Sequence, residues 1–174
     1  LRKAGATVHA VLTAGGAPTL RDVRVQYNFA LTDGAGINVI GSTLSLNSST
    51  VSYNRCNGNG AGIALSSGAI ATLEGCSLYN NAAGFDGPGT GGGAYLSTGS
   101  LLDALNTYFG SNTASNGGGA IGESGGSGLF IRSCTFSANA VNTQAPSPTY
   151  FGGAIWAAGP NTPVQISLST FTSN

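Results

Sequence analysis

The sequence predicts an all-β protein, a right-handed parallel β-helix of about six coils with three short strands in each coil. Two short motifs recur in a fixed phase along the chain, and the apolar residues between them alternate with polar ones. Such repeats are typical of solenoids, in which one coil buries its apolar face only when the next coil stacks on it. We interpret residues 1–174 as a single β-helix segment that belongs to a longer array.

The first motif is an apolar residue, two variable residues and an asparagine. Asparagine tolerates the left-handed backbone conformation of a turn, and stacked asparagine amides can bond from coil to coil. We therefore expect a structural ladder made of Asn28, Asn54, Asn81, Asn112, Asn139 and Asn174.

The second motif is a triplet of small residues followed by isoleucine or tyrosine, where glycine permits a tight corner and a close backbone approach. It occurs as Gly34-Ala35-Gly36-Ile37, Gly60-Ala61-Gly62-Ile63, Gly92-Gly93-Ala94-Tyr95, Gly118-Gly119-Ala120-Ile121 and Gly152-Gly153-Ala154-Ile155. The distance between the two motifs changes only after Asn81 and Asn139. The extra residues, near 82–91 and 140–151, are predicted to be loop insertions at one corner of the stack.

The predicted strands follow from counting back from each asparagine. Apolar residues dominate the eighth and tenth positions before it and also the third, and the phase of the alternation changes in between, which indicates two strands with a bend. Residues after the triplet, such as Ile37 and Val39, supply the third strand. We expect the third position to form an inner column that ends in stacked Phe109, Phe136 and Phe171. Parallel crossovers favour a right-handed coil.

Composition excludes two classes of partner. Formal net charge is zero and no basic stripe is present, so nucleic acid is not an expected partner. No apolar run approaches the roughly 18 residues of a membrane span. Charged residues are only 7% of the chain, and the apolar phase argues against a flexible glycine-rich linker.

The motifs Gly-Gly-Ala-Ile and Phe-x-x-Asn resemble the repeats of the chlamydial polymorphic outer membrane proteins. Residues 152–155 and 136–139 match as written, and residues 118–121 and 171–174 match too. Earlier coils depart from the pattern, with Val or Leu for Phe and Gly-Ala-Gly for Gly-Gly-Ala. The resemblance covers about residues 18–174, and it implies a secreted, adhesin-like β-helix passenger.

A catalytic centre is not expected. β-Helical enzymes that cleave polysaccharides need clustered carboxylates. Counted from the asparagine of each coil, only Asp33 and Asp86 share a register, with one coil between them and so about 10 Å apart. The other four acids are Asp22, Glu74, Asp103 and Glu123. We predict no catalytic residue, no cofactor and no metal site, and a β-helical polysaccharide lyase or hydrolase is the alternative.

The three cysteines give no disulfide framework. Cys76 and Cys134 share an inward register about 10 Å apart, beyond the roughly 7 Å limit for bridging, and are predicted to be buried free thiols. A bond between Cys56 and Cys76 across one coil stays open. Asn47, in Asn47-Ser48-Ser49, is a candidate glycosylation site or a chance sequon.

Two surface features leave further functions open. Tyr53, Tyr79, Tyr108 and Trp156 lie outside the inward registers, either as a strip that binds sugar or protein or as scattered surface aromatics. A row of threonines four residues before the asparagines is interrupted, which disfavours ice binding.

These patterns favour a structural or adhesive module of an extracellular or cell-surface assembly, and a filament building block is included in this expectation. The expected partners are other coils or copies of the same protein stacked end to end, and surface glycans or proteins. An ice- or carbohydrate-binding module is a further alternative.

Overall fold

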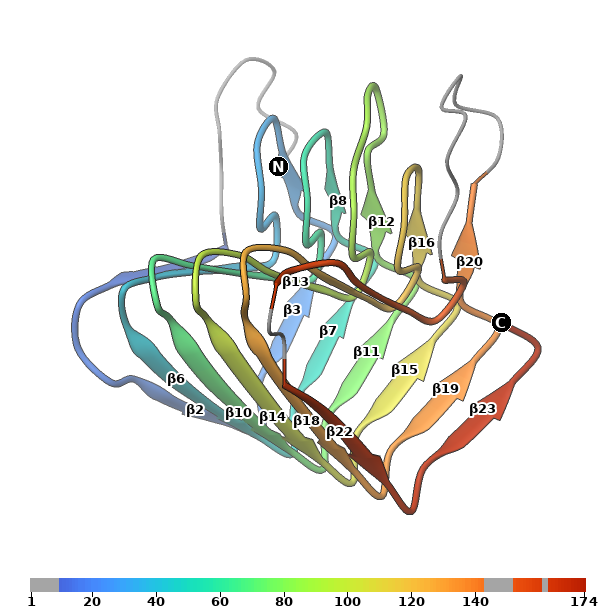
Figure 1. Ribbon diagram of the computed structural model, residues 1–174. Helices are drawn as coiled ribbons and strands as arrows, with labels where there is room; N and C mark the ends of the chain where they lie inside the picture. Colours follow the sequence, from blue (N-terminus) through green and yellow to red (C-terminus); the bar gives the residue numbers. More distant parts are fainter. Residues whose placement is uncertain (1–9, 143–151, 161–162) are drawn as a thin grey trace.

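The computed structural model describes residues 10–142, 152–160 and 163–174. Its strands form four parallel sheets that run along one axis, and each strand pairs with its counterpart in the next coil (Figure 1). The chain makes just over five complete turns, which gives six coils in three of the sheets. The predicted parallel β-helix is confirmed.

Sheet A contains β1 (Val11–Ala14), β5 (Ile37–Ile40), β9 (Ile63–Ser66), β13 (Ala94–Leu96), β17 (Ile121–Glu123) and β21 (Ile155–Ala157). Sheet B contains β2 (Thr19–Arg21), β6 (Thr43–Asn47), β10 (Ile70–Glu74), β14 (Leu101–Leu105), β18 (Gly128–Arg132) and β22 (Val164–Ser167). Sheet C contains β3 (Arg24–Gln26), β7 (Thr50–Ser52), β11 (Ser77–Tyr79), β15 (Tyr108–Gly110), β19 (Thr135–Ser137) and β23 (Thr170–Thr172). Sheet D contains β4 (Phe29–Ala30), β8 (Arg55–Cys56), β12 (Ala82–Ala83), β16 (Thr113–Ala114) and β20 (Ala140–Val141).

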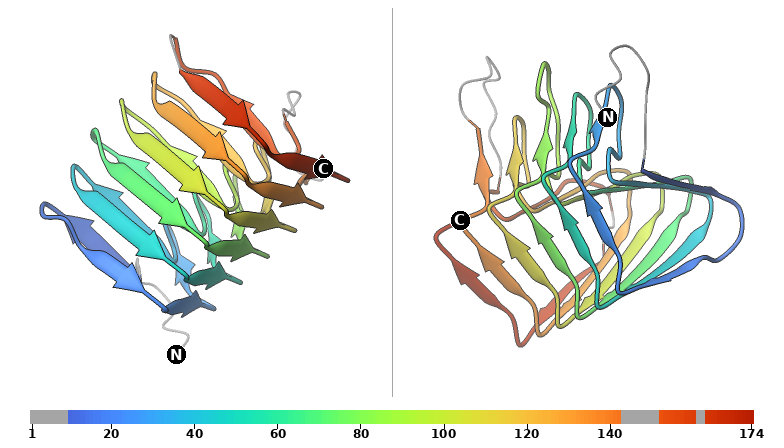
Figure 2. Two further views of the ribbon diagram at one scale, coloured as in Figure 1. Left: turned by 90° about the horizontal axis from the view of Figure 1, so that it is seen from below. Right: turned by 180° about the vertical axis from the view of Figure 1, so that it is seen from behind.

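Sheet D corrects the expectation of three strands per coil. After each of the first five ladder asparagines the chain forms a two-residue strand and then returns through the small triplet toward sheet A. We call this projection the fin; it rises from the prism enclosed by sheets A, B and C (Figures 1 and 2). Two residues are too few for a period-two pattern to show in the sequence. The fin has its own small core of Ala30, Ala35, Cys56, Ala61, Ala83 and Ala114.

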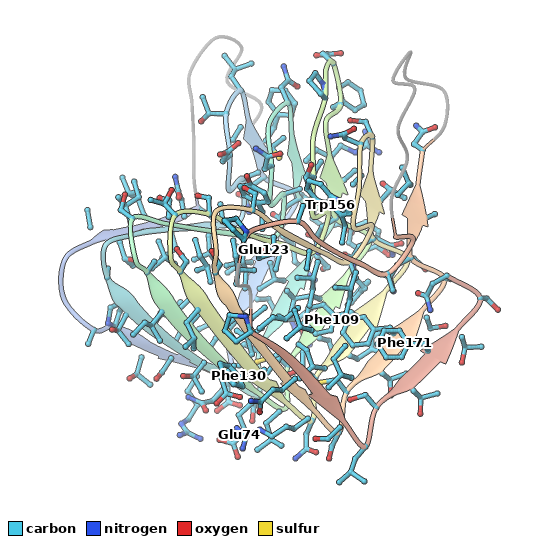
Figure 3. All side chains as sticks on the ribbon, in the orientation of Figure 1. Glu74, Phe109, Glu123, Phe130, Trp156 and Phe171 are labelled. Carbon is cyan, nitrogen blue, oxygen red and sulfur yellow. The ribbon has the colours of Figure 1, made fainter. Side chains whose placement is uncertain are left out.

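The prism core has the predicted registers. Leu46, Leu73 and Ile131 lie in one row of sheet B and are fully buried. Phe109 and Phe136 stack with ring centroids 4.8 Å apart, and Phe136 and Phe171 stack at 4.6 Å. The expected aromatic column is therefore confirmed. Figure 3 shows Phe109 between the sheets and Phe130 on the outer side of sheet B.

The asparagine ladder is confirmed with a defined polarity. The side-chain amide of Asn54 donates to Oδ1 of Asn81 at 3.0 Å, and that of Asn81 donates to Oδ1 of Asn112 at 3.0 Å. Each amide from Asn54 onward also donates to the main-chain carbonyl of the previous coil, as Asn81 does to Val51 at 2.9 Å. Five such side-chain links join the six described asparagines.

The left-handed conformation lies one residue earlier than expected. At this corner, positive φ is found at the residues that directly precede the ladder asparagines: Tyr27, Tyr53, Asn80, Ser111, Ala138 and Ser173. A residue in this conformation turns the chain sharply, so that the following asparagine points inward to the ladder. The prediction that asparagine itself takes this conformation was wrong, because its amide is used for bonding between coils.

One triplet and both insertions are shifted relative to the prediction. Ile63 pairs with Ala94 and not with Tyr95, so the third triplet begins at Gly91. Gly91 has positive φ, like the first glycine of the other triplets. Residues 82–83 and 140–141 are strands of the fin, so the first insertion begins at Gly84 and lies at the tip of the fin. Residues 143–151 of the second insertion lie outside the described residues.

Candidate functional site

The acidic residues do not converge. Asp33 contacts Asn59 of the next coil, and the following residue in that row is Thr90, whose N–H donates to Asn59. The shared register predicted for Asp33 and Asp86 was wrong, because the insertion at the fin tip adds residues between the asparagine and this row. Within residues 10–142, 152–160 and 163–174, no group of three or more His, Cys, Asp or Glu side chains could hold a metal ion.

Glu123 is a buried carboxylate whose position could not be predicted from its spacing to the asparagines. It pairs with Leu96 in an inward row of sheet A, and its side chain is fully buried. Its Oε1 accepts the N–H of Ser127 at 2.7 Å and its Oε2 accepts the N–H of Gly159 at 3.0 Å. The carboxylate therefore joins the turn after β17 to the equivalent turn after β21 in the last coil. The sequence did contain one indication of this burial, because Glu123 follows Leu65 and Leu96 in an inward row of sheet A.

A groove lies where the fin meets the outer face of sheet A. It has a volume of about 420 Å³ and crosses three neighbouring strands, β5, β9 and β13. Its polar and aromatic lining includes Asp33, Asn38, Ser66, Tyr95 and Ser97, and Ala64 contributes a methyl group. None of the residues that line it is an arginine or a lysine.

Comparison with known proteins identifies the fold family. The model of the family described as "Right handed beta helix region" matches residues 8–174. The chain belongs to this family. No curated protein and no solved structure matched the chain. No described helix is long and apolar enough to cross a membrane.

The cysteines of this β-helix are buried and free, as predicted for Cys76 and Cys134. The open pairing of Cys56 with Cys76 is not formed. Cys76 and Cys134 share a corner row with Ser49, Thr107 and others, in which the thiol or hydroxyl donates to the carbonyl two residues earlier. Burial raises the pKa of Cys76 and Cys134, and burial together with the charge of Asp33 raises the pKa of Cys56 to about 12.

The sequon at Asn47 has a structural explanation in the β-helix. Ser49 is buried, its hydroxyl donates to the carbonyl of Asn47 at 2.6 Å, and it accepts the N–H of Val23 at 3.1 Å. The serine that a glycosylation enzyme would have to read is therefore part of the folded corner. The side chain of Asn47 is half-buried at the end of β6.

The exposed aromatic residues of the β-helix do not form one strip. Tyr53 stacks on Tyr27 at 5.0 Å and packs edge-on against Tyr79 at 5.6 Å. Tyr108 lies in the outer row of sheet C, where it interrupts the threonine row, and Trp156 lies in sheet A. The four residues named in the sequence analysis are thus divided between two sheets and a corner.

The fin carries a separate aromatic cluster. The rings of Phe29 and Phe85 meet edge-on at 6.5 Å, and the guanidinium of Arg55 lies 5.4 Å from the centre of the Phe85 ring. A cation over an aromatic face is favourable by about 0.5–1 kcal/mol at an exposed position. Phe29 and Phe85 are 40% and 57% exposed, so the cluster lies on the surface of the fin.

Two arginines, Arg21 and Arg132, lie in one outer row of sheet B. Arg132 donates through Nη2 to both carboxylate oxygens of Asp103 at 2.8 Å. The side chains are 52% and 31% exposed, so the pair contributes about 0–1 kcal/mol. Arg21 and Glu74 occupy the same row in other coils. Arg21 and Glu74 are exposed to solvent.

Proposed function

We propose that this β-helix is a structural or adhesive module of an extracellular or cell-surface assembly, with the adhesin-like role that the polymorphic outer membrane protein repeats suggest. The observation that carries the proposal is the unbroken asparagine ladder, which links all six coils and is fully buried at Asn54, Asn81, Asn112 and Asn139. A rod held by buried amides and apolar rows depends little on salt or on surface charge. Such a rod presents side chains at fixed spacing, which suits repeated contact with a surface.

The dispersed acids support a non-enzymatic role. Hydrolysis of a glycosidic bond by a pair of carboxylates needs them about 5–9.5 Å apart across the same bond. Asp33 is oriented by Asn59, and Asp86 lies in the fin-tip insertion outside its row. In the described part of the chain the carboxylate of Glu123 is committed to two main-chain N–H groups.

The last coil favours stacking on another coil. Val164, Ile166 and Phe171 are 41%, 44% and 45% exposed, whereas the preceding residues of their rows, Leu129, Ile131 and Phe136, are fully buried. A further coil, from a longer chain or from a second copy, would cover this apolar edge. A coil stacked on it would extend sheets A, B and C.

The proposal is tested with beads coated with the chain on films of neutral and acidic polysaccharides. We expect beads to be retained without release of reducing sugar. Release of sugar that is lost in Asp33→Asn or Asp86→Asn would overturn the proposal in favour of an enzyme. For the stacking, a scattering mass that rises with concentration and falls on substituting Phe171→Lys supports it, and a strictly monomeric chain overturns it.

A further inference from the structure

The groove between the fin and sheet A has a rigid floor. Asn38, Ala64 and Tyr95 form one outer row of sheet A, and each lies on a strand that is paired on both sides. No open strand edge lines the groove, so an extended peptide could not bind by adding a strand there. A ligand in the groove must be recognised by side chains and by shape.

Tyr95 forms one wall, and its ring is held in place without being covered by its row neighbours. Those neighbours are Ala64 and Gly122, which offer a methyl group and no side chain. The hydroxyl of Tyr95 lies 2.7 Å from Oγ of Ser124, which fixes the ring. By contrast, Tyr27 and Tyr53 stack on each other, so each of them uses one ring face internally.

Tyr95 is half-buried and lines the groove, and an accessible aromatic face suits one face of a pyranose ring. The ring face carries partial negative charge, and the C–H groups on one side of a sugar carry partial positive charge. Tyrosine also loses little side-chain entropy when a ligand orders it, particularly when its hydroxyl is already bonded.

The lining of the groove also contains a fixed carboxylate, that of Asp33. Oδ1 of Asp33 accepts the N–H of Asn59 at 2.6 Å and its side-chain amide at 3.3 Å. Gly58 leaves the room that this carboxylate occupies, since a β-carbon there would meet Oδ1. Both bonds orient the carboxylate and both use Oδ1. No described group donates to Oδ2, which can therefore accept hydrogen bonds from hydroxyl groups of a ligand. A charge-assisted bond to a hydroxyl is about twice as strong as a neutral one.

The charge of the groove selects against acidic ligands. Its lining contains the Asp33 carboxylate and no cationic side chain, so a uronate would meet uncompensated negative charge. Ser66 and Ser97 add hydroxyl groups that can donate and accept. The combination of one aromatic face, one carboxylate and several hydroxyls matches a chain of uncharged sugars.

We propose that the groove between the fin and sheet A binds a neutral oligosaccharide, with a pyranose ring on Tyr95 and its hydroxyls on Asp33. This inference rests on the proposed adhesive function and gives it a ligand class.

The test is calorimetric titration of the chain with cellohexaose, mannohexaose, xylohexaose and hexagalacturonate. We expect at least one neutral hexasaccharide to bind and hexagalacturonate to bind at least about tenfold more weakly. Tyr95→Ala is expected to weaken the neutral ligand about tenfold, and Tyr95→Phe, which keeps the ring face, about twofold or less. Tyr108→Ala, on the outer face of sheet C, is the matched control and is expected to bind like the parent chain.

Asp33→Asn separates charge from shape. It keeps an oxygen for the N–H of Asn59, and we expect weaker binding of the neutral ligand and stronger binding of hexagalacturonate. Ser66→Arg places a large side chain in the groove from a half-exposed position and is expected to abolish binding. It provides a second test if Tyr95→Ala does not fold.

Three results would overturn the groove as a neutral sugar site. They are no binding of any neutral probe at millimolar concentration, tighter binding of hexagalacturonate, and binding unchanged by both Tyr95→Ala and Ser66→Arg. None of these affects the proposed rod. Cleavage of a bound hexasaccharide would instead overturn the proposed function.

Discussion

The centre of the asparagine ladder is the point at which one substitution should cost most. Asn112 is fully buried, and its Oδ1 accepts both the main-chain N–H of Asn81 at 3.1 Å and its side-chain amide at 3.0 Å. Its own amide donates to the carbonyl of Leu78 at 2.8 Å and to Asn139 at 3.0 Å. Asn112→Ala removes all four bonds in a place that water does not reach.

The magnitude follows from which groups lose every partner. The main-chain N–H of Asn81 loses its acceptor, which costs about 1–3 kcal/mol for a buried donor. The side-chain amide of Asn81 keeps the carbonyl of Val51, so it loses only one of two bonds, about 1 kcal/mol. The carbonyl of Leu78 also loses the bond from the Asn112 amide. Together these losses lead us to expect that Asn112→Ala lowers the free energy of unfolding by about 3 kcal/mol.

Urea unfolding followed by circular dichroism measures this cost, with Asn28→Ala as the matched control. Asn28 is the first described member of the ladder, half-buried, and its amide only donates to Asn54. Its loss should cost about 1 kcal/mol. If the two substitutions lowered stability equally, the argument that orphaned amides dominate the ladder would fail.

Three further predictions concern the core, the buried acid and the thiols. Phe136→Ala should lower the free energy of unfolding by about 3–5 kcal/mol, and Phe29→Ala, 40% exposed, by clearly less in the same urea titration. Glu123→Leu should speed hydrogen exchange at the Gly159 amide by mass spectrometry, and unchanged exchange would refute the carboxylate link. Because folding raises the pKa of Cys56 from its ordinary 9.0 to about 12, its contribution to stability is complete below pH 9 and is lost as the pH rises toward 12. Alkaline unfolding of Cys56→Ala should lack this loss, and an identical pH profile would contradict it.

Residue spacing alone was sufficient for the repeated parts of the fold. In a parallel stack, residues in phase become neighbours, so the positions of Asn81, Phe136 and Cys134 in their rows followed from counting. The prediction failed where the count was interrupted. The insertion after β12 displaced Asp86 from the row of Asp33, and the third triplet was misplaced by one residue.

The sequence by itself determined a parallel β-helix with an asparagine ladder and a phenylalanine column, because both depend only on period and phase. Only the tertiary structure decided that a fourth sheet forms the fin, that Glu123 is buried and that Asp33 and Tyr95 line one groove between the fin and sheet A. The physical reason is that these features depend on how the chain bends between rows, and that direction is fixed by backbone turns and side-chain contacts that spacing does not encode.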